Sequence, residues 1–157
     1  MPAAAWIVVP TLCEAANVER MAGALRAVGP SGAHVLIVDD ASPDGTGAIA
    51  DRLAATDENI SVLHRESARG LGPAYVDGFA HALAHGAGSI VQIDCDFSHD
   101  PAMVPVLLRA LDAGADLALG RDTCPAAAWR TGRPGDGPCR ARAAPTRARS
   151  CACPCGT

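Results

Sequence analysis

Asp94 and Asp96, two carboxylates separated by one residue, are suited to holding a hard cation. They follow the apolar run 89–93, which the pattern predicts to be a buried strand. Beyond a strand end, residues i and i+2 can both turn toward one ligand. Mg²⁺ and Mn²⁺ prefer oxygen ligands, and Mg²⁺ typically combines one or two carboxylates with substrate phosphate oxygens. The alternative is structural, with Asp96 capping a turn and Asp94 solvated, and a lone D-x-D leaves both readings open.

Asp39 and Asp40 form a second acidic pair, directly after the apolar run 34–38. Acidic residues at this place in α/β proteins commonly accept hydrogen bonds from a ribose or base. In the alternative, Asp40 and Ser42 bond nearby backbone amides and only build a turn. A phosphorylation receiver domain also has paired acids after a strand, but it needs a lysine after its fifth strand. The chain has no lysine, so this class is excluded.

Other polar residues are weaker signals. The loop Arg69-Gly70-Leu71-Gly72 could bring backbone amides close to a phosphate, or it could simply be a tight turn. The sequence has neither G-x-G-x-x-G nor a P-loop, which argues against dinucleotides and P-loop nucleotides. His99 and Asp100 precede Pro101, where a role in starting a helix is favoured over catalysis. Cys95 is expected to be a small, core-facing residue rather than a nucleophile.

The elements that must position these residues alternate along the chain. The patterns predict strands over 6–9, 34–38, 60–63, 89–93 and 116–119, and helices over 15–28, 46–55, 70–85 and 101–111. This alternation predicts an α/β fold with a mostly parallel sheet and helices on both faces. Ligands bind beyond the carboxyl ends of such strands. We therefore expect Pro10–Glu14, Asp39-Asp40 and Asp94–Asp96 to meet at one edge of the sheet.

Charge and cysteine content divide the chain near residue 120. Residues 1–120 carry six Arg and fifteen acids (net −9), whereas residues 121–157 carry seven Arg and two acids (net +5). Only Cys13 and Cys95 precede the break, and five cysteines follow it. No signal peptide and no run of about 18 apolar residues is apparent, so we expect a cytoplasmic protein without a transmembrane segment.

Four motifs in the first part resemble family 2 glycosyltransferases. They are V-V-P-T-L-C-E-A-A-N-V at 8–18, V-L-I-V-D-D-A-S-P-D-G-T at 35–46, R-G-L-G-P-A-Y at 69–75 and Q-I-D-C-D-F-S-H-D-P at 92–101. Their order and the forms S-P-D-G-T and D-F-S-H-D-P are most similar to dolichyl- or polyprenyl-phosphate mannosyltransferases. One departure is Leu12-Cys13, where the family usually has Tyr-Asn, so an aromatic surface for the base is absent.

The resemblance implies a GT-A fold and a metal-dependent, inverting transfer of mannose from GDP-mannose to a polyprenyl phosphate at the membrane surface, with Mg²⁺ or Mn²⁺ as cofactor. We expect no nucleic-acid partner, although the seven Arg of residues 121–157 leave nucleic acid or anionic lipid as a weaker alternative. By position, the resemblance implies that the nucleotide sugar is contacted by Pro10, Leu12, Glu14, Val38 and Asp40. It implies that Asp94, Cys95 and Asp96 form the metal and diphosphate motif, which includes the catalytic acids Asp94 and Asp96. Ser98 is implied as a further metal ligand. A transferase for another nucleotide sugar, or a binding remnant without turnover, remains an alternative.

The resemblance stops at Gly120, and we expect a truncated GT-A domain over 1–120 followed by a disordered tail over 121–157 that is rich in Arg, Pro and Cys. The family continues with a motif like G-S-R-Y-V-P-G-G-G. Reading the codons of residues 120–128 one base out of frame permits this motif, because Asp122-Thr123 can yield Tyr and Pro125–Ala128 can yield three Gly. We therefore expect the tail to be a frameshifted translation that leaves little or no activity. Zinc binding by Cys151, Cys153 and Cys155 is a weaker alternative, because structural zinc sites use paired C-x₂₋₄-C spacings.

Overall fold

The computed structural model describes residues 4–67 and 70–120. The expected tail over 121–157, with its three candidate zinc ligands, lies outside the described residues. The chain divides into two compact units, one up to Leu108 and a second from Arg109 onward. The sheet, the first three helices and the residues of all four motifs belong to the first unit.

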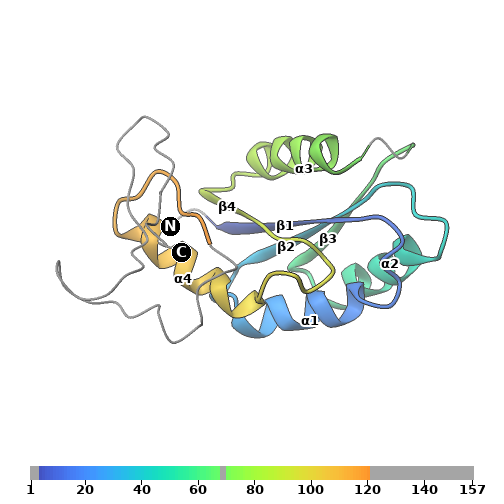
Figure 1. Cartoon of the computed structure of the whole chain (residues 1–157), viewed down its shortest axis with the longest axis horizontal. Coiled ribbons are helices and arrows are strands. Elements are labelled where there is room, and N and C mark those ends of the chain that lie inside the picture. The colour runs from blue at the N-terminus through green and yellow to red at the C-terminus, as the bar shows by residue number, and fades with distance from the viewer. Residues whose placement is uncertain (1–3, 68–69, 121–157) are drawn as a thin grey trace, which may run out of the picture. The chain divides into compact units, whose positions relative to one another are not determined.

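A four-stranded parallel sheet forms the centre of the first unit (Figure 1). Its strands are β1 (Ala5–Thr11), β2 (His34–Asp39), β3 (Ile60–His64) and β4 (Ser89–Gln92), in the order β3-β2-β1-β4. Six residues of β1 and five of β2 are buried. Continuous apolar strands of this kind are expected where helices cover both faces of a parallel sheet.

The helices divide between the two faces (Figure 1). Helices α1 (Val18–Val28) and α2 (Thr46–Thr56) lie below the sheet in this view, and α3 (Leu71–Ala84) lies above it. A short 3₁₀ helix, η1 (Pro101–Met103), continues into α4 (Val104–Asp112). The predicted α/β architecture is thus confirmed. None of the described helices is long and apolar enough to cross a bilayer.

The predicted element boundaries differ from the structure mainly at loop ends. Helix α1 begins at Val18 rather than at residue 15, because the preceding residues form turns. The strand predicted over 116–119 is wrong: this segment has no strand structure, and Leu117 and Leu119 are exposed. A four-residue run becomes a strand only when its backbone groups pair with a neighbouring strand. Among the described residues, 116–119 have no such partner.

Helix α3 approaches the sheet closely through a row of small residues. Ala74, Gly78 and Ala82 are spaced four apart and are buried. A Cβ atom at Gly78 would lie 2.5 Å from Val8 Cγ1 and 3.0 Å from Val38 Cγ2. Both valines are fully buried in the sheet, so neither side chain has space to move away. The absence of a side chain at Gly78 therefore sets the distance between α3 and the central strands.

We predict that Gly78→Ala lowers the free energy of unfolding by about 1–2 kcal/mol, because overpacking outweighs the better helix propensity of alanine. The matched control is Gly23→Ala in α1, where no atom lies within 4 Å of the added Cβ. That change should be neutral or stabilise by up to about 1 kcal/mol. Urea denaturation of the two variants measures both effects, and equal stabilities would show that α3 does not pack this closely.

Candidate functional site

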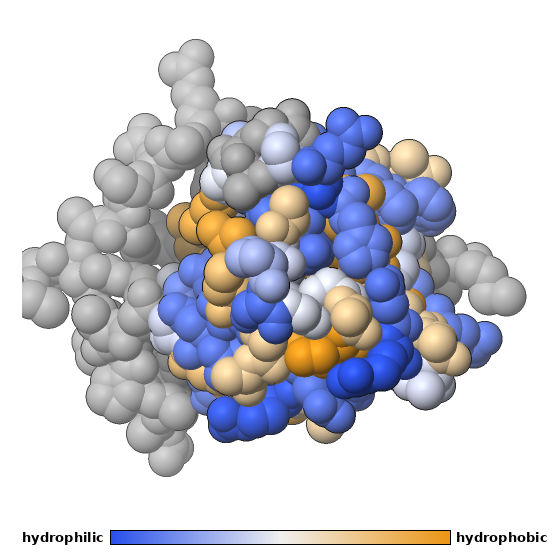
Figure 2. Space-filling model, turned by 90° about the vertical axis from the view of Figure 1, so that its right-hand side faces the viewer, coloured by the Kyte–Doolittle hydropathy of each residue, from blue (hydrophilic) through white to orange (hydrophobic). Residues whose placement is uncertain are grey.

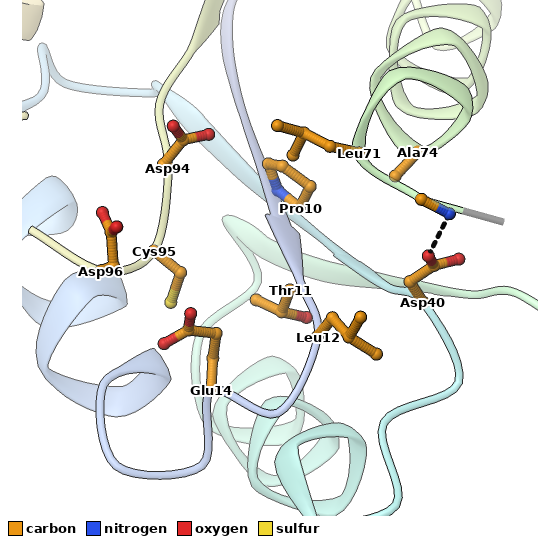
Figure 3. A pocket seen from close by; sticks show the side chains of 11 residues that line it. Pro10, Thr11, Leu12, Glu14, Asp40, Leu71, Ala74, Asp94, Cys95 and Asp96 are labelled. Atoms are coloured by element: carbon orange, nitrogen blue, oxygen red, sulfur yellow. Dashed lines mark hydrogen bonds between the residues drawn. The ribbon is translucent and has the colours of Figure 1, made fainter. Parts of the chain in front are cut away.

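A cleft opens where β1, β2 and β4 end and α3 begins (Figure 3). Its volume is about 260 Å³, below the usual range for sites that enclose a whole ligand. The lining comes from three strand ends and one helix start: Pro10, Thr11, Leu12, Glu14, Asp40, Gly70, Leu71, Ala74, Asp94, Cys95 and Asp96. Figure 2 views the molecule from this end and shows a mainly hydrophilic surface with a small apolar area near its centre.

The loop after β1 is held by the S-P-D-G-T segment after β2. The hydroxyl of Ser42 accepts a hydrogen bond from the Cys13 amide (3.1 Å). The Glu14 amide donates to the Thr46 hydroxyl (2.9 Å), and the Ala15 amide donates to the Asp44 carboxylate (3.0 Å). The hydrogen bond from the Thr46 hydroxyl, followed by that from the Ala15 amide, lowers the pKa of Asp44. Three consecutive amides are thus fixed by the S-P-D-G-T segment.

Glu14 enters the cleft from this loop. Its carboxylate reaches toward Cys95 in Figure 3 and accepts a hydrogen bond from the side chain of Asn17 (2.8 Å). Burial, and then the negative charges of Glu14 and Asp96, raise the pKa of the Cys95 thiol to about 12. Cys95 is therefore a protonated, buried thiol, as expected for a packing residue. Cys13 and Cys95 are both free thiols.

Asp40 is held at the end of β2 by a buried ion pair with Arg65, a residue that the sequence had not singled out. Arg65 Nη1 donates to Asp40 Oδ1, and the Gly70 amide donates to Asp40 Oδ2 (2.8 Å). The two side chains are only 2% and 4% exposed. Arg65 Nε also donates to Asp77 of α3 (2.9 Å). Asp40 thus lines the cleft and also fixes the start of α3.

Asp94 and Asp96 lie on the loop after β4 (Figure 3). Asp94 Oδ1 accepts a hydrogen bond from the Tyr75 hydroxyl (2.6 Å). Burial, and then this hydrogen bond, raise the pKa of Tyr75, so the phenol remains a donor. Asp96 Oδ1 accepts from the Ser98 amide (2.9 Å), which lowers the pKa of Asp96. Asp96 therefore caps a turn, as the structural alternative predicted, and it also lines the cleft.

Two residues selected from the sequence do not line the cleft. Val38 is fully buried among the core residues between the sheet and α3. Ser98 is exposed, and its hydroxyl lies 2.9 Å from His99 Nδ1. Asp100 caps η1 by accepting from the Ala102 amide (2.9 Å), which confirms its predicted helix-entry role.

Glu14, Asp94 and Asp96 make the cleft acidic, and within the described residues none of the three takes part in an ion pair with Arg or Lys. Within the same described part of the chain, no group of three or more His, Cys, Asp or Glu residues could hold a metal ion. Two carboxylates nevertheless fit the chemistry of Mg²⁺ or Mn²⁺ when phosphate oxygens supply further ligands. The donor set therefore fits a metal that arrives with a phosphate-bearing ligand.

The backbone is strained in three loops that follow β1, β2 and β4. Cys13 (φ 58°), Ala41 (φ 58°) and Phe97 (φ 61°) adopt left-handed conformations that are unfavourable for residues with a side chain. The guanidinium of Arg20 lies 4.9 Å from the Phe97 ring centroid, which helps to hold one of these residues. Strain of this kind is characteristic of ligand-binding loops.

We predict that Asp40→Ala lowers the free energy of unfolding by about 3–5 kcal/mol, because it leaves the buried Arg65 charge without this partner. Glu58→Ala, which removes an exposed carboxylate, is the control and should change stability by less than about 0.5 kcal/mol. Denaturant titration monitored by circular dichroism compares them. A loss below about 1 kcal/mol for Asp40→Ala would contradict a stabilising role for the ion pair.

Known proteins with similar sequences agree with the α/β fold described above. The model of the glycosyl transferase family 2 matches residues 6–144. The chain is 46% identical over 115 residues to the polyprenol monophosphomannose synthase of Mycolicibacterium smegmatis, covering 73% of this chain and 43% of that protein. It is 43% identical over 129 residues to the undecaprenyl-phosphate mannosyltransferase of Micrococcus luteus, covering 80% of this chain and 52% of that protein. The chain thus spans about half the length of these relatives.

A solved structure gives the same result for the fold. The mannosyltransferase PcManGT from Pyrobaculum calidifontis, in complex with GDP-Man and Mn²⁺, is 27% identical and superposes with a TM-score of 0.50. The match covers 61% of this chain and 28% of that one. It confirms the expected GT-A type of fold for the described sheet and helices. The chain belongs to the glycosyl transferase family 2.

Proposed function

We propose that residues 1–120 are the GDP-mannose-binding half of a mannosyltransferase whose acceptor is a polyprenyl phosphate. The observation that carries the proposal is the meeting of Glu14, Asp40, Asp94 and Asp96 in one cleft at the strand ends. The names of the two bacterial relatives support the lipid phosphate acceptor, and the ligand of PcManGT supports GDP-mannose.

In this proposal the residues from β1 and β2 bind the nucleoside. Pro10 and Leu12 provide apolar surface beside the base, and Asp40 accepts a hydrogen bond from the base or ribose. Arg65 and the Gly70 amide hold the Asp40 carboxylate in place. Val38 supports this side of the cleft from within the core. The exposed Leu12 replaces the usual tyrosine and provides less surface for the base.

Asp94 and Asp96 are proposed to hold Mg²⁺ or Mn²⁺ together with the diphosphate. Ser98 is proposed as a further oxygen ligand from its motif position alone; its hydroxyl lies beside His99, outside the cleft lining, and would turn toward the ion on binding. When bound there, the ion would supply positive charge against the negative charge that develops on the departing diphosphate. Cys95 keeps the backbone between the two acids close to the core, because its buried thiol packs there. Glu14 adds a third negative charge beside the thiol.

The transfer is proposed as a single displacement with inversion. An oxygen of the lipid phosphate forms a bond to the anomeric carbon of mannose, while the bond from that carbon to the GDP oxygen breaks. A lipid phosphate is already anionic, so the step needs no strong general base. Alignment of the two substrates is the main demand on the protein. The acceptor places the reaction at a membrane surface, and we assign it to the cytosolic face.

We expect the 157-residue chain to bind GDP at least about tenfold more tightly with Mn²⁺ than with EDTA, which corresponds to about 1.4 kcal/mol. In Asp94→Ala and Asp96→Ala the metal dependence should disappear while metal-free binding is retained. Glu66→Ala, an exposed carboxylate outside the cleft lining, is the control. Calorimetric titration measures all four proteins, and wild-type metal dependence in both cleft variants would refute the metal assignment.

Two alternatives are separated by further measurements. A transferase for another nucleotide sugar would bind UDP in preference to GDP in the same titration. A binding remnant would hold GDP but form no lipid-extractable mannose from labelled GDP-mannose and polyprenyl phosphate. The frameshift proposed near codon 120 favours weak or absent turnover in the chain as it stands.

The frameshift has its own test. Restoring one base near codon 120 should extend the reading frame through R-Y-V-P-G-G-G, increase the soluble fraction and produce mannosyl transfer. The described part has exposed apolar residues, Val76 and Leu83 among them, and the restored segment is proposed to cover apolar surface. Resequencing the source DNA checks the premise directly. A confirmed frame together with full activity of the 157-residue chain would contradict the frameshift.

A further inference from the structure

Helix α3 connects the two opposite edges of the sheet at the level of the cleft. In the order β3-β2-β1-β4, the strands β3 and β4 are the edges. Arg65 follows β3 and pairs with Asp77 of α3 (2.9 Å), whereas Asp94 follows β4 and accepts from Tyr75 of α3 (2.6 Å). Helix α3 thus contacts Arg65, the partner of Asp40, on one side and the cleft residue Asp94 on the other.

The position of α3 between these contacts is fixed by packing. Ala74, Gly78 and Ala82 form its buried face against the sheet. On a helical wheel, Tyr75 and Asp77 fall on opposite flanks of this face. Gly78 allows a close approach to Val8 and Val38, which limits any shift of the helix. The Tyr75 hydroxyl is therefore held at the cleft by a helix that has little freedom to move.

The Tyr75 side chain is itself restrained. Its ring lies 5.7 Å from that of Phe79, measured between centroids, one turn along α3. Its hydroxyl makes a short, charge-assisted hydrogen bond to a carboxylate. Among the described residues, no Arg or Lys pairs with Asp94. Tyr75 is thus the group that orients the Asp94 carboxylate.

We infer that Tyr75 is a positioning residue, which acts through Asp94 by fixing one carboxylate oxygen so that the other faces the divalent metal and diphosphate. The inference rests on the proposed function. Outer partners that orient a metal-binding side chain typically contribute 10- to 100-fold to metal affinity. The phenol takes no part in bond formation, so its effect is on ion binding and diphosphate placement.

The test is Mn²⁺ binding by the 157-residue chain in the presence of GDP, followed by the electron paramagnetic resonance signal of free Mn²⁺. Tyr75→Phe keeps the ring and removes the hydroxyl. We expect about 10- to 100-fold weaker Mn²⁺ binding, with GDP affinity in EDTA unchanged. Phe79→Leu, on the same flank of α3, is the control for ring packing and should bind Mn²⁺ like the parent. In an Asp94→Asn background, Tyr75→Phe should have no further effect.

The outcomes separate the two proposals. If the parent binds GDP with metal dependence and Tyr75→Phe equals the parent, the role of Tyr75 is wrong and the proposed function stands. An equal loss in Phe79→Leu and Tyr75→Phe would assign the effect to packing and also overturn the inference. A parent that binds GDP without metal dependence would refute the metal-dependent function and the role of Tyr75 with it.

Discussion

Parallel pairing of β1 with both β2 and β4 is the constraint on which the site depends. It aligns three strand ends at one edge, with Thr11 opposite Asp39 and Val8 opposite Gln92 in register. The residues that follow these strands then occupy one cleft although they lie far apart in sequence. This parallel pairing is stable because the apolar side chains of the strands are buried on both faces of the sheet. A change that shifted one strand would separate the carboxylates.

Strand ends alone do not fix side chains, and three sets of contacts complete the arrangement. Ser42, Asp44 and Thr46 hold the amides of the loop after β1. The ion pair between Arg65 and Asp40 joins the end of β2 to the start of α3. Tyr75 joins α3 to the loop after β4. The loops can therefore keep strained residues such as Cys13 and Phe97, because neighbouring contacts oppose relaxation.

The sequence predicted the local features best. Apolar runs and helical spacing located the four strands and the helices, since these patterns follow directly from burial. The run 116–119 has the same kind of composition but lacks a partner among the described residues, and pairing cannot be read from one segment. The acidic pairs were found because strand ends predict where ligands bind. Arg65 and Tyr75 were missed, because their importance comes from contacts with residues 25 and 19 positions away. Two signals in the sequence could have pointed to them: Arg65 directly follows a predicted strand, and Tyr75 is the aromatic residue of R-G-L-G-P-A-Y.

The family and the fold of the chain are established by its similarity to known proteins. The proposed roles of its cleft residues depend on one claim: that Asp94 and Asp96 hold a divalent ion with the diphosphate. The most direct measurement is anomalous diffraction from crystals of the chain grown with GDP and Mn²⁺. The account predicts one anomalous peak within about 2–2.5 Å of an oxygen of each carboxylate, adjoining diphosphate density. A peak elsewhere, or bound GDP with no peak between Asp94 and Asp96, would contradict it.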